Sequence, residues 1–258
     1  MPDSDPRVAE HYDDLAGYWV QITDSPSRQQ LLWPTLTELL PNLADRRVLD
    51  AGCGSGVYTA KIAERGADVV GVDISEQMVR EAQNRAPDAE FRQANLGEPL
   101  EFIEDSSVDV VLCQHVFSHL EELSTPLAEF ARILSEDGVL VVSTHNPVHD
   151  YSVVRDGQYP TTGEEADVEA VVETGPDAPQ YDATERYDIR WIAEGGENRG
   201  TYYRRSIEEL FTSIIDAGFS IQSVVEPTPD NTFKRDYPQL AQALQNHPPE
   251  SICLRAQR

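Results

Sequence analysis

Short apolar runs rich in β-forming residues alternate with helical patterns between residues 47 and 146. Two parallel strands need a long crossover connection, usually a helix, so this alternation is typical of a sheet built from β-α-β units. The pattern predicts an α/β fold with a doubly wound, mostly parallel sheet. The expected strands here are 48–51, 68–72, 90–93, 108–113 and 139–144, and the expected helices are 58–65, 76–85 and one from Pro126 to Asp137-Gly138.

The sheet is expected to continue after an insertion. From Pro147 to Tyr203 the alternation stops, and only residues 187–193 and 201–205 show strand periodicity, which predicts a small antiparallel cap. Ser206-Ile207-Glu208-Glu209 is a capping box that opens a helix, and Gly218 ends it. The last elements expected are strands at 219–225 and 251–255, which bring the sheet to seven strands, and a helix near 239–245.

The charge of the chain is strongly negative. Its 46 acidic residues face 20 basic ones, a net charge of -26, and lysine supplies only Lys61 and Lys234. Such a charge repels the phosphates of nucleic acids and anionic lipids, so neither is expected as a partner. It also destabilises the folded state by self-repulsion, which molar salt would relieve by shortening the Debye length to about 3 Å. We therefore hypothesise that the protein is halophilic.

Cysteine usage and the amino-terminal residues bear on the compartment. The three cysteines, Cys53, Cys113 and Cys253, have unrelated spacings that suggest neither a disulfide framework nor a metal site. Residues 1–5 lack the basic and apolar regions of a signal peptide, and no apolar run approaches the roughly 20 residues of a membrane helix. We expect a cytoplasmic protein, either a monomer or a homodimer.

The strongest functional signal is a strand that runs into a glycine-rich turn, Val48 to Gly56. Gly52, Gly54 and Gly56 let the backbone turn tightly and let a ligand approach main-chain N–H groups at a helix start. A dinucleotide fingerprint would need glycine at Val57, and the carboxylate of Asp50 would repel a pyrophosphate. The same carboxylate would attract a methionine ammonium, directly or through water.

A second acid ends the next expected strand. Asp73 lies 17 positions beyond Gly56, where a carboxylate can accept both hydroxyls of a ribose. This spacing indicates adenosine and does not by itself distinguish a methyl donor from NAD. Ile74 and Met78 either sandwich an adenine ring or pack in the core. Replacing Asp73 by alanine is expected to weaken cofactor binding and to leave the fold nearly intact.

Together these residues resemble the class I S-adenosylmethionine-dependent methyltransferases, in particular the small-molecule group related to quinone-biosynthesis methyltransferases. The resemblance covers residues 10–258, with 48–56 similar to the first motif, 69–74 to the ribose-binding acid and 108–120 to the strand after the adenine site. It implies S-adenosylmethionine as cofactor, Asn95-Leu96 at the adenine edge and Gln114 in the same site. The family usually has Asp where Asn95 stands, and an amide oxygen can still accept from the adenine amino group.

The resemblance also implies a domain organisation. The whole chain is expected to form a single methyltransferase domain with an amino-terminal helical lid that folds over the cofactor. In that lid Tyr12 and Tyr18 are candidates to reach the cofactor, or they belong to a helix that packs on the sheet. Arg28 either pairs with the methionine carboxylate or forms a surface ion pair. The expected parts are the lid at 1–45, the cofactor-binding core at 46–146, the cap insertion at 147–203 and the carboxyl-terminal part of the sheet at 204–258.

Methyl transfer is an in-line displacement, so the chain must align a small-molecule acceptor and remove its proton where needed. Candidate bases are His115, His119, His145 and His149, which follow the fourth and fifth expected strands. No metal is expected, because these pairs lack both the HExxH glutamate and a zinc cysteine set. Two alternatives stay open, an NAD-dependent oxidoreductase and a non-catalytic protein that binds S-adenosylmethionine.

Overall fold

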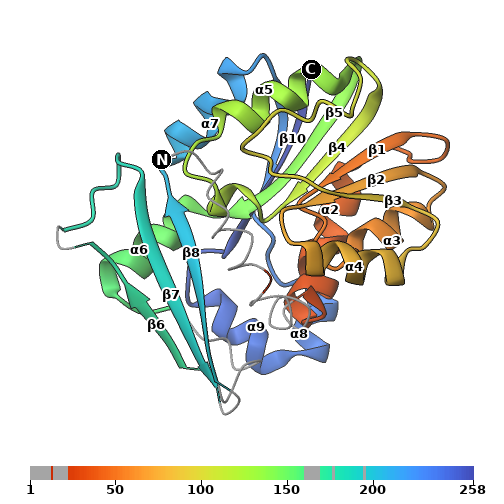
Figure 1. Ribbon diagram of the computed structural model, residues 1–258. Coiled ribbons are helices and arrows are strands. Elements are labelled where there is room, and N and C mark those ends of the chain that lie inside the picture. Colours follow the sequence, from red (N-terminus) through yellow and green to blue (C-terminus); the bar gives the residue numbers. More distant parts are fainter. Residues whose placement is uncertain (1–12, 14–22, 160–168, 176–177, 194–195) are drawn as a thin grey trace.

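The computed structural model describes residue 13 and residues 23–159, 169–175, 178–193 and 196–258, which form two sheets and the helices around them (Figure 1). The larger sheet has seven strands in the order β3-β2-β1-β4-β5-β10-β9. All neighbouring strands are parallel except β10, which runs antiparallel to both β5 and β9. The predicted α/β fold with a doubly wound, mostly parallel seven-stranded sheet is therefore confirmed. Its strands are β1 Arg47–Ala51, β2 Asp68–Asp73, β3 Glu90–Gln93, β4 Val108–Gln114, β5 Leu134–His145, β9 Ser220–Val225 and β10 Ser251–Gln257.

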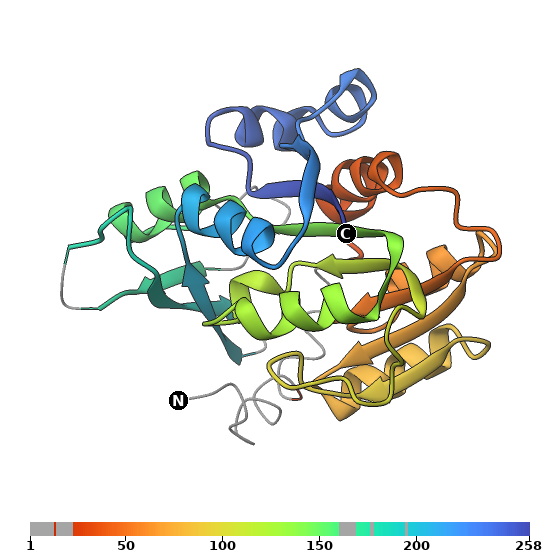
Figure 2. The ribbon, with the colours of Figure 1, turned by 90° about the horizontal axis from the view of Figure 1, so that it is seen from above.

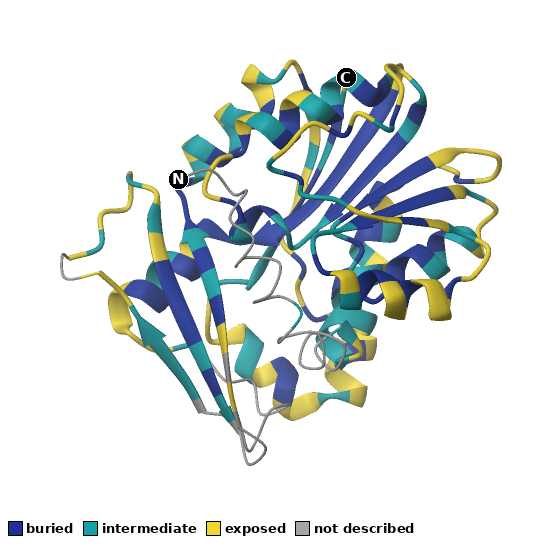
Figure 3. Cartoon of the chain, viewed as in Figure 1, coloured by how far each residue is buried: buried dark blue, intermediate teal, exposed yellow. Residues whose placement is uncertain are grey.

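Alternate residues of the central strands pack on opposite faces of this sheet. In β1, Val48 joins a cluster with Leu36 and Ile62, while Leu49 joins a cluster with Phe130 and Ile214. Helices α2 and α3 therefore cover one face and α5 and α7 the other, as Figure 2 shows for α2 against α5 and α7. The central strands β1, β2, β4 and β5 are buried along much of their length (Figure 3), which explains their nearly continuous apolar sequences.

Local capping signals agree with several of the helices. The Ser75 hydroxyl accepts from the Met78 N–H at the start of α4, and the Ser206 hydroxyl accepts from the Glu209 N–H at the start of α7. Only this half of the predicted capping box is seen, because the Glu209 carboxylate accepts from the Thr184 hydroxyl. The helices are η1 Ser27–Leu32, α2 Trp33–Leu39, α3 Val57–Ala63, α4 Glu76–Arg85, η2 Phe117–His119, α5 Ser124–Ile133, α6 Pro147–Asp156, α7 Ile207–Asp216, α8 Asn231–Asp236 and α9 Pro238–Gln245.

The end of α5 differs from the prediction. The helix stops at Ile133, and β5 starts at Leu134, although the Asp137-Gly138 pair reads as a helix stop. A shift in register between Val108 and Val110 accommodates the extra residues of β5 beside β4. The polar stretch is thus the irregular start of a long strand.

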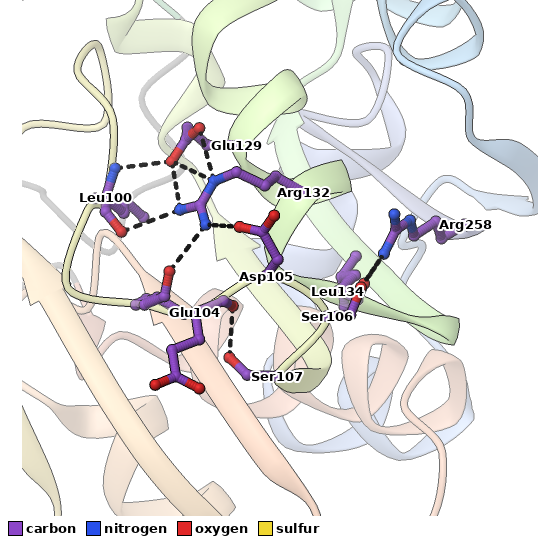
Figure 4. Close-up of polar contacts among 10 residues, drawn as sticks. Leu100, Glu104, Asp105, Ser106, Ser107, Glu129, Arg132, Leu134 and Arg258 are labelled. Atoms are coloured by element: carbon purple, nitrogen blue, oxygen red, sulfur yellow. Dashed lines mark hydrogen bonds and ion pairs between the residues drawn. The ribbon is translucent and has the colours of Figure 1, made fainter.

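A half-buried arginine fixes the long connection between β3 and β4. The Arg132 guanidinium donates to the carbonyl oxygens of Leu100 and Ile103 and pairs with Glu129 and Asp105 (Figure 4). Carbonyl groups of a loop need such partners when they lie away from water. Arg132 therefore holds residues 100–105 against α5.

The smaller sheet is the expected antiparallel cap, and it has one strand more than predicted. Its strands are β6 Glu169–Glu173, β7 Glu185–Ala193 and β8 Gly196–Arg204, in that spatial order. Helix α6, which was also not predicted, packs Val153 and Val154 against Tyr187, Ile189 and Tyr202 of this sheet. The cap lies beside the carboxyl end of β5 (Figure 1).

Candidate functional site

A cavity lies at the carboxyl ends of β1, β2, β4 and β5, where ligands of doubly wound sheets bind. It brings together twelve of the residues singled out from the sequence, from six separate stretches of the chain. These are Arg28, Gly52, Gly54, Asp73, Ile74, Met78, Asn95, Leu96, Gln114, His115, His119 and His145. Asp50 and Gly56 do not line it, and Tyr12 and Tyr18 lie outside the described residues.

The glycine turn forms the floor of the cavity in a conformation that other residues rarely adopt. Gly52, Gly54 and Gly56 have φ values of 77°, 52° and 76°. A Cβ on Gly52 would lie 2.2 Å from Val116 Cγ2, and one on Gly56 would lie 2.9 Å from Ala82 Cα. Gly56 thus serves the close approach of α3 and α4, whereas Gly52 and Gly54 face the cavity.

The carboxylate of Asp73 ties this turn to the end of β2. It accepts from the Gly54 N–H at 2.8 Å and from the Ser75 N–H at 3.0 Å. Burial raises the pKa of Asp73, although these backbone hydrogen bonds oppose the rise. Removing the side chain would leave two backbone donors without their acceptor, so the expectation of a nearly intact fold does not fit these contacts.

Asp50 lies behind the turn and not in the cavity wall. Its carboxylate is 1% exposed and accepts from the Thr59 hydroxyl of α3. Burial, opposed by that hydrogen bond and assisted by the charge of Asp73, raises the pKa of Asp50 to about 7. The charge of Asp50 therefore acts on the cavity from behind the glycine turn. Thr59 was not identified from the sequence as the hydrogen-bond donor to Asp50.

Arg28 brings the only guanidinium among the described residues that line this cavity. Its Nη2 lies 3.3 Å from Glu250 Oε1, and its side chain is 12% exposed. Its Nη1 is buried and has no hydrogen-bond partner among the described residues. The expected surface ion pair is therefore a nearly buried one, with one donor left for an anion in the cavity.

The residues considered for adenine lie together at another part of the wall. Ile74, Met78, Asn95 and Leu96 all line the cavity, and Met78 and Leu96 are buried. The Asn95 side-chain oxygen accepts from the Gly97 N–H at 2.9 Å, which shapes the turn after β3. Met78 thus packs in the core and also faces the cavity.

Comparison with known proteins relates this chain to methyltransferases. Residues 49–142 match the family described as methyltransferase domain. A probable S-adenosylmethionine-dependent methyltransferase of Mycobacterium tuberculosis is 38% identical over 136 residues, 52% of this chain and 45% of that protein. A ubiquinone biosynthesis O-methyltransferase of Paracidovorax citrulli is 28% identical over 150 residues, 55% of this chain and 63% of that protein. The chain therefore matches about half the length of such relatives.

Solved structures extend the likeness to most of the fold. A putative S-adenosylmethionine-dependent methyltransferase from Listeria monocytogenes superposes with a TM-score of 0.66 at 24% identity, over 88% of this chain and 96% of that one. The predicted class, an S-adenosylmethionine-dependent methyltransferase, and its cofactor are borne out by the family match over residues 49–142 and by these relatives. The matches favour this class over an NAD-dependent oxidoreductase.

Three histidines line the end of the cavity nearest the cap. His115 directly follows β4 with a φ of 52°, and its Nε2 lies 3.0 Å from Ser251 Oγ. Burial and the neighbouring charges of Arg28, His145 and His119 lower the pKa of His115 well below its usual range. Such strained residues cluster at functional sites. His115 is therefore a neutral imidazole whose ring is positioned by its contact with Ser251.

His119 and His145 flank a tyrosine of the cap. Their rings lie 4.8 Å and 5.2 Å from that of Tyr202, centroid to centroid. His119 Nδ1 lies 3.1 Å from the Thr201 carbonyl oxygen. His149, the fourth candidate, does not line the cavity. Three candidate bases thus share one wall of the cavity with an aromatic ring behind them.

Other lining residues gave no sufficient signal in the sequence. They are Thr23, Cys53, Ser55, Tyr58, Ala94, Val116 and Leu120. Four of them directly follow a residue singled out from the sequence, namely Gly52, Gly54, His115 or His119, and Ala94 directly precedes Asn95, so their place in these turns could have found them. Within the described ranges, no helix is long and apolar enough to cross a membrane.

Proposed function

We propose that this protein transfers the methyl group of S-adenosylmethionine to a small-molecule acceptor held at the histidine end of the same cavity. The observation that carries the proposal is the joining of two unlike halves in one cavity. One half has a glycine turn, a strand-terminal carboxylate and a buried guanidinium with a free donor. The other half has imidazoles and apolar side chains and lies against the cap.

Each group of the cofactor has a matching residue in this proposal. Asp73 accepts from the ribose hydroxyls with the lone pairs that Gly54 and Ser75 leave. Arg28 Nη1 donates to the methionine carboxylate, and the charge of Asp50 favours the ammonium through the turn. The remaining cofactor contacts are assigned to Gly52, Gly54, Ile74, Met78, Asn95, Leu96 and Gln114.

The amino-terminal residues are proposed to cover the cofactor. Asp13, a described residue of that part, accepts from the Gln77 N–H and the Ser75 hydroxyl at the start of α4. This contact holds Asp13 near Asp73, and the charge of Asp13 contributes to the raised pKa of Asp73. In this proposal Tyr12 and Tyr18 belong to the amino-terminal lid and are candidates to contact the cofactor.

The acceptor is proposed to be a small molecule. Tyr202 of the cap stacks on His145 at the histidine end, and the net charge of -26 opposes binding of a nucleic acid. The likeness to a ubiquinone biosynthesis O-methyltransferase supports a quinone-like phenol as one acceptor class. A non-catalytic binding protein would have the same cofactor half, and only turnover separates the two.

The test begins with calorimetry on purified protein in molar KCl. We expect binding of S-adenosylmethionine and S-adenosylhomocysteine and no comparable binding of NADH. Asp73→Asn should weaken binding, while Asp68→Asn, at the exposed opposite end of the same strand, should not. Tight NADH binding without binding of S-adenosylmethionine would refute the proposal.

Turnover is tested by incubating the protein with methyl-labelled S-adenosylmethionine and a whole extract of its source cells, which contains both small molecules and nucleic acids. A labelled metabolite that requires active protein supports the proposal. Label found only on nucleic acid would contradict the small-molecule acceptor, and cofactor binding without any labelled product would favour the non-catalytic alternative.

A further inference from the structure

A histidine and an aspartate form a buried pair where the cavity meets the cap. His145 Nδ1 lies 3.2 Å from Asp150 Oδ1, and the two side chains are only 7% and 3% exposed. His145 lines the cavity, whereas Asp150 does not. The Asp150 carboxylate therefore does not contact the cavity itself and acts on it through the His145 imidazole.

Short-range structure brings these two residues together. β5 ends at His145, Asn146 caps α6 by accepting from the Val148 N–H, and Asp150 lies in the first turn of that helix. The Asp150 N–H donates to the Asn146 carbonyl oxygen at 2.9 Å. The amino-terminal end of a helix stabilises a negative charge. Asp150 is thus held as a carboxylate five residues after His145.

The ring of His145 is held on three sides. Tyr202 stacks on it at 5.2 Å with an interplanar angle of 19°, and His115 meets its edge at 5.5 Å. The Tyr187 hydroxyl lies 3.5 Å from Nδ1, on the side of Asp150. With Nδ1 turned to these two partners, Nε2 is the nitrogen left for a group in the cavity.

We infer that His145 removes the proton from the hydroxyl of a planar, phenol-like acceptor and that Asp150 positions His145 and stabilises the imidazolium that forms in this step. The inference rests on the proposed function. The acceptor O–H bond gives its proton to Nε2, and the oxygen lone pair forms the new bond to the methyl carbon. The C–S bond breaks with its electron pair left on sulfur, and the positive charge passes to the imidazolium beside Asp150.

The chemistry of the pair selects a hydroxyl acceptor. A carboxylate acceptor is already deprotonated at neutral pH and would need no base, and it would be repelled by Asp150 and Glu250. A flat ring suits an end of the cavity lined by His115, His119 and His145 together with Val116 and Leu120. A phenol meets both requirements, because it is planar and its hydroxyl must lose a proton.

The charges around His145 give this step a pH dependence. Burial disfavours the imidazolium, but the Asp150 carboxylate, its contact with Nδ1 and the charge of Glu250 outweigh both burial and Arg28 and raise the pKa of His145. His145 and His149 in turn hold the pKa of Asp150 below its usual range in spite of its burial. The groups that face His145 are Asp150 and His149 of α6, Glu250 before β10, Arg28 of η1, His115 after β4, Tyr187 of β7 and Tyr202 of β8.

The first experiment follows the imidazoles by NMR and needs no turnover. Protein with labelled histidines is titrated with S-adenosylhomocysteine bound, and His145→Gln assigns the signal. Asp150→Asn should lower the pKa of His145 by about 1 or more, the usual effect of losing one adjacent opposite charge. The matched control Asp188→Asn removes a carboxylate of the cap that pairs with Arg199 and Thr201, and it should leave His145 unchanged. An unchanged pKa in Asp150→Asn would overturn the role of Asp150.

The second experiment uses 4-nitrophenol as probe, because its phenolate is seen by absorbance. At a pH where the free probe is neutral, protein loaded with S-adenosylhomocysteine should bind it as phenolate. His145→Gln should bind it as the neutral phenol, and Asp188→Asn should behave like the unaltered protein. Equal phenolate formation in His145→Gln would overturn the inference. In a parallel assay with S-adenosylmethionine, methylation of amine probes with phenols left untouched would also overturn it.

The outcomes distinguish this inference from the proposed function. If S-adenosylhomocysteine binds normally to every variant and His145 still fails both tests, only the base assignment is lost. If the unaltered protein does not bind S-adenosylhomocysteine, the proposed function itself fails. Circular dichroism of each variant tests whether it is folded. If Asp150→Asn does not fold, Asp150→Glu takes its place, and this variant should keep part of the raised pKa of His145.

Discussion

Replacing Gly52 by alanine should destabilise the protein by an amount that the geometry of the turn predicts. Gly52 has a φ of 77°, and a new Cβ would lie 2.2 Å from Val116 Cγ2. A left-handed alanine costs roughly 1–2 kcal/mol and overpacking roughly 1–3 kcal/mol, so the free energy of unfolding should fall by about 2–5 kcal/mol. Gly54→Ala is the matched control, because its φ is 52° but nothing lies within 4 Å of the new Cβ. Its loss should be only about 1–2 kcal/mol.

Val116 offers a way to separate the two contributions. Val116→Ala removes the Cγ2 atom and leaves the next contact of the new Cβ at the 3.5 Å position of Val116 Cβ. In the double variant the overpacking should vanish, giving a coupling of about 1–3 kcal/mol between the two substitutions. Urea unfolding followed by circular dichroism in molar KCl measures the unaltered protein, the three single variants and the double variant. A Gly52→Ala variant no less stable than Gly54→Ala, or zero coupling to Val116→Ala, would refute the reasoning.

Further outcomes are expected from other substitutions and conditions. Asp73→Ala should weaken S-adenosylmethionine binding measured by calorimetry and also lower the urea midpoint, because two backbone N–H groups lose their acceptor. Arg28→Gln should weaken that binding by about 10- to 150-fold, the equivalent of one charged hydrogen bond of about 1.5–3 kcal/mol. Stability should fall as pH rises from the unfolded pKa of Asp50, 3.8, towards its folded pKa of about 7, and unfolding of Asp50→Asn across this range should lack that slope. The melting temperature should rise strongly from salt-free buffer to molar KCl, and full folding without salt and without a gain from KCl would contradict the halophile hypothesis.

The sequence predicted those parts of the fold whose signals are local. β1, the glycine turn and β2 were expected within a residue of their observed bounds, because apolar runs and glycines act on their own neighbours. The doubly wound, mostly parallel sheet was expected from the β-α-β rhythm, whereas the order of its strands was not predicted. Helix α6 was missed even though Asn146-Pro147 is a cap followed by a first-turn proline. That pair also reads as a turn, and only packing of α6 on the cap decides between the two.

The site shows the same division between local and distant information. Asp73 and the glycines could be placed in the cavity from the turn that contains them. Asp50 looked equivalent to Asp73, since both end strands, but its contact with Thr59 takes it behind the turn. Asp150 had no signal at all, because its pairing with His145 depends on how α6 leaves β5. Arg28 was a candidate, and only its burial beside Glu250 shows which of its donors is free.

A crystal structure of the protein with S-adenosylhomocysteine tests the central claim most directly. The account predicts that both ribose hydroxyls lie within hydrogen-bond distance, about 2.5–3.2 Å, of the Asp73 carboxylate and that the ligand carboxylate contacts Arg28 Nη1. An adenosyl group bound elsewhere, with Asp73 contacting only Gly54 and Ser75, would contradict it.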